Sequence, residues 1–183
     1  MQIHPHNTFW LEEKVDESMM SYIRSQIKLA KLDYKHELVG HISSSLQLPD
    51  VENKLSNYVL DVAKQLNYLY TPDLEMKKTW VNFQKKYEFN PVHYHGGTIS
   101  FVIWVKVPYT YEDECKVDSV RNRERPCAGC FEFLHTNTLG QIKKTLYPPT
   151  ENILLVFPST LSHCVYPFYT SDEERISISG NID

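Results

Sequence analysis

The feature that most constrains this chain is a change of hydrophobic period near residue 74. From there to the C-terminus, seven short segments favour β-strands, and turn signals rather than helical patterns separate them. Short strands in such succession indicate an antiparallel barrel or jelly roll. The predicted strands are 78–87, 98–107, 130–135, 141–146, 152–157, 162–166 and 175–181.

The first third of the chain has the period of helices. A first helix is predicted to begin at Asp16 or Ser18 and to run to about Lys31. A second begins at Pro49-Asp50, presents one apolar stripe, and ends at Thr71-Pro72. Both helices therefore have a face to bury against the strands that follow.

A chain of 183 residues is long enough for one well-buried core. We expect a single domain over 1–183, mainly β in the α+β class, with a helical part at 1–72 and a strand-rich core at 74–183. The net charge of −4 provides no basic face, so no nucleic-acid partner is indicated.

The N-terminal sequence contains no cationic stretch followed by an apolar run. The longest apolar run, 99–105, is far shorter than the roughly 20 residues that cross a bilayer. We therefore expect a cytoplasmic protein without a membrane span, and four cysteines that remain reduced thiols.

Two histidines stand at the entry to the most apolar predicted strand. His93 and His95 are separated by one residue, and alternate side chains of an extended chain project from the same face. Two imidazoles placed in this way can take adjacent positions on one metal ion. Taken alone, such a pair is more often a solvated part of a turn.

A third histidine and an arginine follow near the C-terminus. His163 alone is more often a structural residue, but Arg175 comes 12 residues later, beyond a turn-like segment that predicts a hairpin joining the two strands. Alternation places Arg175, Ser177 and Ser179 on one face. Burial of an unpaired guanidinium is costly, which points to an anionic ligand. The alternative is an exposed Arg175 paired with Glu173 or Glu174.

Taken together, these motifs resemble the 2-oxoglutarate/Fe(II) oxygenases, particularly prolyl-hydroxylase-like oxygenases of phages and marine bacteria. The resemblance spans roughly 80–182 and depends on His93-x-His95, on Phe157-Pro158-x-x-x-x-His163-x-Val165-x-Pro167, and on Arg175-x-Ser177-x-Ser179-x-Asn181. It implies a double-stranded β-helix, or jelly roll, that binds Fe(II) and 2-oxoglutarate and uses O2. It further implies oxidative decarboxylation of 2-oxoglutarate coupled to hydroxylation of a substrate.

Carried over by motif, the first iron ligand is His93, the distal ligand is His163, and Arg175 with Ser177 binds the far carboxylate of 2-oxoglutarate. This chain departs from the family at His95, where a carboxylate is usual. Three interpretations of how the metal site is completed stay open. His95 binds the metal itself, Glu132 supplies the carboxylate, or His95 is the first ligand and Gly97 leaves a vacancy for an anion.

Asn82, Tyr87 and Tyr147 are candidates for additional contacts to 2-oxoglutarate, although each such residue is more often a core or surface residue. The resemblance implies a small-molecule or peptide substrate and leaves a homodimer open. A phage-encoded protein would act in the host cytoplasm.

The charged segment 109–126 is a candidate substrate lid because of its length and position. The Cys127-x-x-Cys130 spacing suits zinc, but Cys115 and His135 would have to complete such a site, and free thiols are the simpler interpretation.

Two competing functions remain open. A cupin-like three-histidine metalloenzyme without 2-oxoglutarate would normally carry a glutamate soon after the histidine pair, whereas the next acidic residue here is Glu112. The other is a non-catalytic jelly-roll binding module.

Overall fold

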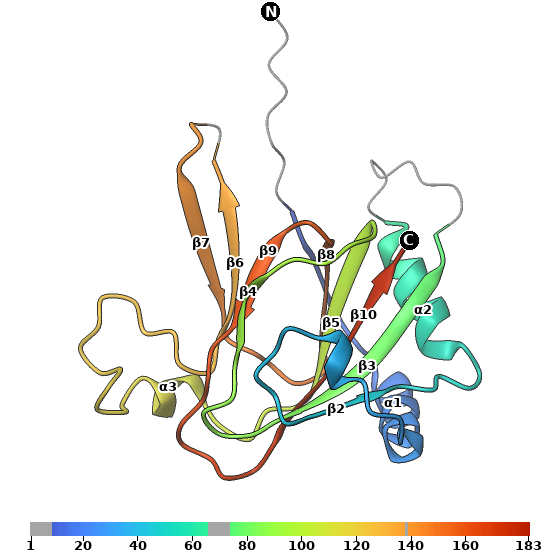
Figure 1. The fold of residues 1–183 in the computed structure, drawn as a ribbon, viewed down its shortest axis with the longest axis horizontal. Helices are drawn as coiled ribbons and strands as arrows, with labels where there is room; N and C mark the ends of the chain where they lie inside the picture. The colour runs from blue at the N-terminus through green and yellow to red at the C-terminus, as the bar shows by residue number, and fades with distance from the viewer. Residues whose placement is uncertain (1–8, 66–73, 138) are drawn as a thin grey trace, which may run out of the picture.

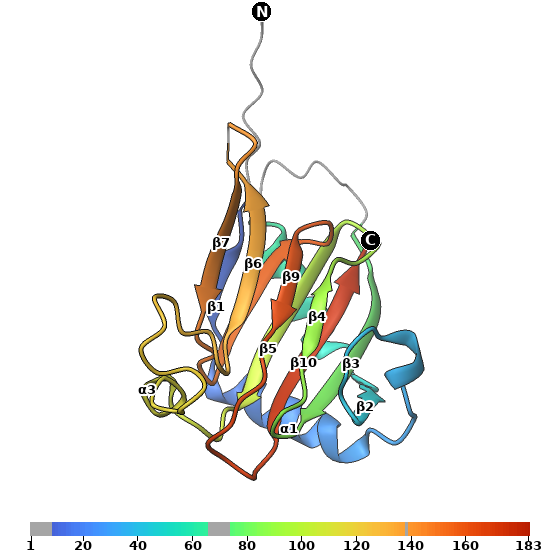
Figure 2. The same ribbon diagram turned by 60° about the vertical axis from the view of Figure 1, so that its left-hand side comes forward.

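The computed structural model describes residues 9–65, 74–137 and 139–183, and contains two antiparallel sheets (Figures 1 and 2). The six-stranded sheet has the order β1-β8-β5-β10-β3-β2, and the four-stranded sheet has the order β4-β9-β6-β7. This arrangement confirms the expected jelly-roll core. The strands are β1 (Leu11–Lys14), β2 (Ser44–Gln47), β3 (Met76–Gln84), β4 (Asn90–His93), β5 (Ile99–Lys106), β6 (Phe131–Thr136), β7 (Ile142–Tyr147), β8 (Ile153–Pro158), β9 (Ser162–Val165) and β10 (Arg175–Ile182).

All seven predicted strands are present, and three more were missed. The missed strands β1, β2 and β4 have four residues each and add to the sheets beside β8, β3 and β9. A segment of four residues is too short to establish a period of two in the sequence. Its strand conformation depends on a partner that is distant along the chain.

Two helices lie in the N-terminal part, as predicted. Helix α1 (Glu17–Leu29) begins after Asp16, whose side chain accepts a hydrogen bond from the Met19 amide at 2.9 Å. Helix α2 (Lys54–Ala63) begins later than predicted, because residues 51–53 form a turn instead. Asp50 still serves its start by accepting from the amides of residues 55 and 56. The predicted remainder, 66–72, lies outside the described residues.

The six-stranded sheet is covered on both faces. On one face, apolar residues of α1 and α2 pack against β5, β8 and β10. On the other face, Val102 and Trp104 of β5 and Leu155 and Phe157 of β8 contact the aromatic residues of β6. The two helices thus support the sheet from outside. The space between the two sheets holds the site described below and the residues of β5, β6 and β8 just named, which we call the second aromatic cluster.

The predicted hairpin between His163 and Arg175 is wrong. Strand β9 belongs to the four-stranded sheet and β10 to the six-stranded sheet, so the chain crosses from one sheet to the other between them. The intervening segment is fixed by Glu114 of the short helix α3 (Tyr111–Glu114), a buried carboxylate that accepts from the amides of Tyr169 and Thr170.

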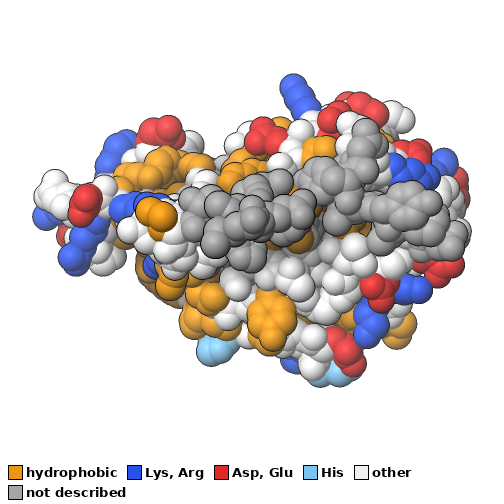
Figure 3. All heavy atoms as spheres, turned by 90° about the horizontal axis from the view of Figure 1, so that it is seen from above, with side chains coloured by type: hydrophobic (Ala, Val, Ile, Leu, Met, Phe, Trp, Pro, Cys, Tyr) orange, Lys and Arg blue, Asp and Glu red, His pale blue; other side chains and the backbone are white. Residues whose placement is uncertain are grey.

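No helix within the described ranges is both long and apolar enough to cross a membrane. On the face seen from above, the described Lys and Arg side chains are interspersed with Asp and Glu rather than gathered in one basic patch (Figure 3). A short 3-10 helix, η1 (Lys35–Glu37), completes the secondary structure that bears on the site.

Candidate active site

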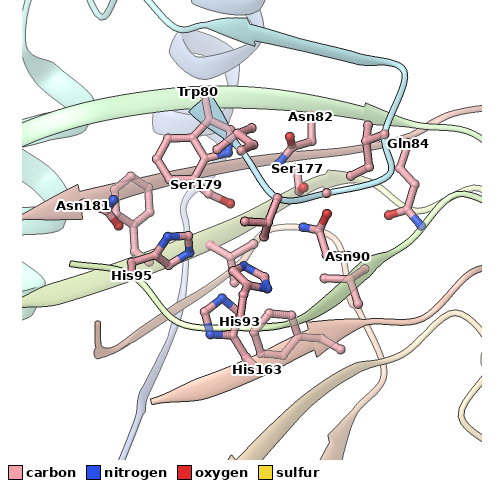
Figure 4. Close-up of a pocket in the computed structure, with 18 of the residues that line it drawn as sticks. Trp80, Asn82, Gln84, Asn90, His93, His95, His163, Ser177, Ser179 and Asn181 are labelled. Atoms are coloured by element: carbon pink, nitrogen blue, oxygen red, sulfur yellow. The ribbon is translucent and has the colours of Figure 1, made fainter. Parts of the chain in front are cut away.

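Three histidines, one on β4, one just beyond its end and one on the neighbouring β9, converge between the sheets. His93 of β4 is the register partner of His163 of β9, and His95 follows two residues later on the same side of the chain. One ligand atom of each histidine lies within 4.8 Å of the others. The close-up shows the three rings pointing toward one another (Figure 4). Such a spacing allows all three to contact a single metal ion.

The backbone fixes which nitrogen the rings of His93 and His163 present. Nδ1 of His93 is 2.8 Å from the Pro91 carbonyl oxygen, and Nδ1 of His163 is 2.8 Å from the Leu161 carbonyl oxygen. A carbonyl can only accept, so each Nδ1 carries the proton and each Nε2 has a free lone pair. The backbone amide of His95 donates to the Ser159 carbonyl oxygen at 2.8 Å and anchors the third residue.

Burial keeps the three imidazoles neutral, which is the form that binds metals. Desolvation lowers the pKa of His163 to about 3 and the pKa of His95 to about 4, and neighbouring histidines add to both effects. Burial also lowers the pKa of His93, against the opposing effect of its bond to Pro91. The cluster therefore needs no deprotonation before a cation enters at neutral pH.

A ladder of polar side chains forms the opposite wall of the site. Register pairs Arg175 with Gln84, Ser177 with Asn82, and Ser179 with Trp80 across β10 and β3. These residues and the three histidines line one pocket of about 300 Å³. Figure 4 labels all of them except Arg175. The predicted alternation is confirmed, because Ile178 points the other way into the core against the helices.

Arg175 lies at the inner end of this ladder and is 2% exposed. It donates to the Tyr109 hydroxyl at 2.5 Å, to the Gly129 carbonyl oxygen at 2.6 Å, and to Oε1 of Gln84. All three acceptors are uncharged, and no described carboxylate forms an ion pair with Arg175. The exposed arginine considered as an alternative is therefore wrong, and Glu173 pairs with Lys106 instead.

Comparison with known proteins decides the family. Residues 78–181 match the model of the family described as "Putative 2OG-Fe(II) oxygenase", which is more than half of the chain. The chain belongs to the 2OG-Fe(II) oxygenases. The family predicted from the motifs is thereby confirmed, and so are the enzyme class and the expectation of iron and 2-oxoglutarate as its cofactors, whereas the origin in phages or marine bacteria stays a prediction. No curated protein sequence matches this oxygenase.

Solved structures with the same fold support the architecture. A viral collagen prolyl hydroxylase from Paramecium bursaria Chlorella virus-1, in complex with 2OG, is 14% identical with a TM-score of 0.60, covering 95% of both chains. HygX from Streptomyces hygroscopicus, with nickel, 2-oxoglutarate and hygromycin B bound, is 10% identical with a TM-score of 0.58, covering 94% of this chain and 82% of HygX. A Trichoplax adhaerens prolyl hydroxylase in complex with a hypoxia inducible factor peptide fragment is 12% identical with a TM-score of 0.56, covering 94% and 81%. At these identities the likeness concerns the fold.

The residues of this oxygenase fit a divalent transition metal. Three neutral imidazoles, of which His93 and His163 have Nε2 free, form a donor set that iron accepts, and buried aromatic rings surround it. His163 stacks on Phe131 with centroids 5.4 Å apart, and Phe157 meets its edge at 5.0 Å. These rings exclude water from the side of the cluster that faces β6 and β8.

Neither alternative source of a third ligand is supported. Glu132 lies between Phe131 and Phe133 on β6 and faces away from the histidines, where it accepts from the Tyr166 hydroxyl at 2.8 Å and pairs with Arg125 at 2.9 Å. Gly97 is absent from the described pocket lining. A Cβ at Gly97 would instead meet the Ile182 carbonyl oxygen and the Asp183 side chain.

Of the three further residues predicted to contact the cosubstrate, one lies inside the pocket and two lie outside it. Asn82 lines the pocket, and its Oδ1 accepts from the Ser45 hydroxyl at 2.7 Å, which turns the amide nitrogen away from that bond. Tyr87 is 63% exposed and contacts Tyr169 at the surface. Tyr147 stacks on Trp104 in the second aromatic cluster. The two tyrosines therefore have no support as cosubstrate ligands.

The predicted lid, 109–126, does not line the pocket, and a different segment walls it. Six residues between 34 and 42 line it, whereas none of the described residues in 109–126 does. Zinc at the cysteines is not supported either. Within the described chain, the histidine cluster alone groups three or more residues that could hold a metal, and His135 bonds to Thr145 instead.

Three parts of the site were missed by sequence reasoning. Gln84 could have been found, because it lies two residues beyond Asn82 on the same face of a predicted strand. Tyr109 and the wall at 34–42 carry no such signal, since each reaches the site through chain crossings that the local sequence does not specify.

Proposed function

We propose that this oxygenase couples oxidative decarboxylation of 2-oxoglutarate to hydroxylation of a small-molecule or peptide substrate, with His93, His95 and His163 as the iron ligands. One observation carries the proposal. A buried guanidinium without a carboxylate partner among the described residues lines the same pocket as three neutral, convergent imidazoles. A dianionic 2-oxo acid complements both features at once.

Each residue then has a defined task. Bound Fe(II) supplies the chemistry that activates O2. His93 and His163 would hold the metal through Nε2, and His95 through one of its ring nitrogens. Arg175 receives the distal carboxylate of 2-oxoglutarate, for which its planar fork is suited, and Ser177 adds a hydroxyl two residues along the same face. Asn82 presents its amide beside Ser177 and is a further contact for the cosubstrate.

The substrate would approach past the other end of the ladder. Trp80 stacks on Tyr34 with centroids 5.6 Å apart and lies 5.8 Å from His95, so an aromatic surface leads from the wall at 34–42 to the histidines. The two ends of the pocket thus separate a carboxylate-binding part from an open, aromatic part. This division favours an organic substrate at the aromatic end and disfavours a three-histidine enzyme without a cosubstrate.

Succinate formation tests the proposal. The protein is incubated with Fe(II), 2-oxoglutarate, ascorbate and O2, and succinate is measured against a His163→Ala variant prepared in the same way. We expect slow succinate release by the wild type, faster release when a substrate is present, and none above background from the variant. Equal succinate from both proteins, or none from iron-loaded wild type, would reject the proposal.

A further inference from the structure

Both polar atoms of the Gln84 side-chain amide are held by hydrogen bonds inside the pocket. Its Nε2 donates to the Glu88 carbonyl oxygen at 2.5 Å, and its Oε1 accepts from Arg175. Gln84 is 3% exposed. Because a backbone carbonyl cannot donate, the amide cannot be reversed, and its oxygen must face the guanidinium.

Tyr109 and Gly129 hold the guanidinium from another side. Arg175 donates to both, and the Tyr109 hydroxyl itself donates to the Gly129 carbonyl oxygen at 2.6 Å. The Tyr109 ring stacks on Phe168 with centroids 4.8 Å apart, which fixes the position of the hydroxyl. We call Gln84, Tyr109 and the Gly129 carbonyl the arginine acceptors.

The Cys127-x-x-Cys130 segment acquires a role through this contact. The Cys130 amide donates to the Cys127 carbonyl oxygen at 3.0 Å and closes a turn in which Gly129 has a φ of 72°. A Cβ at Gly129 would lie 2.6 Å from Cε2 of Tyr109. The turn therefore presents a carbonyl to Arg175 at a position where only glycine allows Tyr109 to approach.

The arginine acceptors share one property, which is that none carries a charge. Burial raises the pKa of Tyr109, against the opposing effect of Arg175, so the phenol stays neutral. Three of the five guanidinium N–H groups are used by the acceptors, and two remain for a ligand. A glutamate at position 84 would keep an acceptor for Arg175, but it would lose the donor to the Glu88 carbonyl oxygen and would neutralise the cation.

We propose that the arginine acceptors are positioning groups that orient Arg175 without neutralising it, and that the uncharged amide of Gln84 makes the pocket select 2-oxo acids that carry a second, distal carboxylate. This inference rests on the proposed function, because it takes that carboxylate to bind Arg175. It assigns ligand-charge selectivity to a residue that contacts the arginine rather than the ligand.

The test compares two ligands of equal chain length. Under anaerobic conditions, the Fe(II)-loaded protein is titrated with 2-oxoglutarate and with 2-oxopentanoate, which has a methyl group in place of the distal carboxylate. The proteins are wild type, Gln84→Glu, Gln84→Met, Tyr109→Phe and the matched charge control Gln47→Glu, whose side chain is exposed on β2. Thermal unfolding of each protein is recorded in parallel.

We expect Gln84→Glu to weaken 2-oxoglutarate binding by at least about tenfold while 2-oxopentanoate binding changes by less than about twofold. Gln84→Met removes one orienting bond without adding charge, so its loss for 2-oxoglutarate should be smaller, about two- to tenfold. The contrast between the two ligands is diagnostic. A merely structural role predicts that each variant weakens both ligands alike, since both variants lose the bond from position 84 to the Glu88 carbonyl oxygen.

The remaining outcomes of the titrations also decide the inference. The inference is overturned if Gln84→Glu binds 2-oxoglutarate as Gln47→Glu does, or if it loses both ligands equally. If Gln84→Glu does not fold, Tyr109→Phe decides, and must lose affinity for 2-oxoglutarate but not for 2-oxopentanoate. If wild type itself does not prefer 2-oxoglutarate, the contact between Arg175 and the distal carboxylate fails, which rejects the proposed function separately.

Discussion

His93 and His163 face each other as register partners across β4 and β9, and their ring centroids lie 4.3 Å apart. Seventy residues separate them in the sequence, but the ladder of the four-stranded sheet sets their spacing. Each ring is also oriented by a bond from Nδ1 to a backbone carbonyl two residues earlier. The site is thus built from backbone geometry and is preorganised for a metal ion.

His95 is expected to be a true ligand, and metal affinity tests this directly. His95→Ala should weaken binding of an oxygen-stable probe such as Ni(II) by at least about tenfold, because one of three donors is lost. His95→Asp should retain binding, since a carboxylate completes the more usual face. His135→Ala is the control, as its ring bonds to Thr145 away from the cluster. Unchanged affinity in His95→Ala would remove His95 from the ligand set.

Glu132 is expected to matter for stability and not for metal binding. Its buried carboxylate accepts from Tyr166 and pairs with Arg125 on the far side of β6. Glu132→Gln should lower the free energy of unfolding by about 1–3 kcal/mol, as measured by denaturant titration. Ni(II) affinity should stay at the wild-type value. A variant that unfolds normally but no longer binds metal would restore Glu132 as a ligand.

The pocket wall at 34–42 depends on a glycine. A Cβ added at Gly40 would lie 1.8 Å from Oδ1 of Asn90, whereas one added at Gly96 would meet nothing within 4 Å. Gly40→Ala should therefore cost about 1–3 kcal/mol of stability, because the wall or Asn90 must move. Gly96→Ala, the matched variant in the same pocket, should change stability by less than about 0.5 kcal/mol. Equal stabilities of the two variants would show that the wall is loosely held.

The sequence predicted those features that depend on residues close together in the chain, and it missed those that depend on distant partners. Alternation in β10 placed Arg175 and Ser177 on one face, and the structure agrees because a strand fixes neighbouring side chains by itself. The hairpin from His163 to Arg175 failed because a turn-like segment does not specify to which sheet the next strand returns. The structure does not support Tyr87 and Tyr147 as cosubstrate contacts, for a related reason. Tyr87 lies in the turn after β3 and Tyr147 at the end of β7, and the local sequence does not tell which way either ring turns.

Identity of the third ligand could not be read from the motif, since His95 stands where a carboxylate is usual. The structure narrows the question, because Glu132 faces away and Gly97 is not part of the pocket lining. Only the assembled sheet shows that His95 reaches the other two histidines.

The most direct measurement is the visible absorption of the anaerobic protein with Fe(II) and 2-oxoglutarate. Wild type should develop a weak metal-to-ligand charge-transfer band that saturates at one 2-oxoglutarate per iron. Arg175→Ala should bind iron normally but require much more 2-oxoglutarate, and His163→Ala should give no band. A wild-type protein that contains stoichiometric iron yet shows no band, or an Arg175→Ala variant that titrates like wild type, would contradict the account.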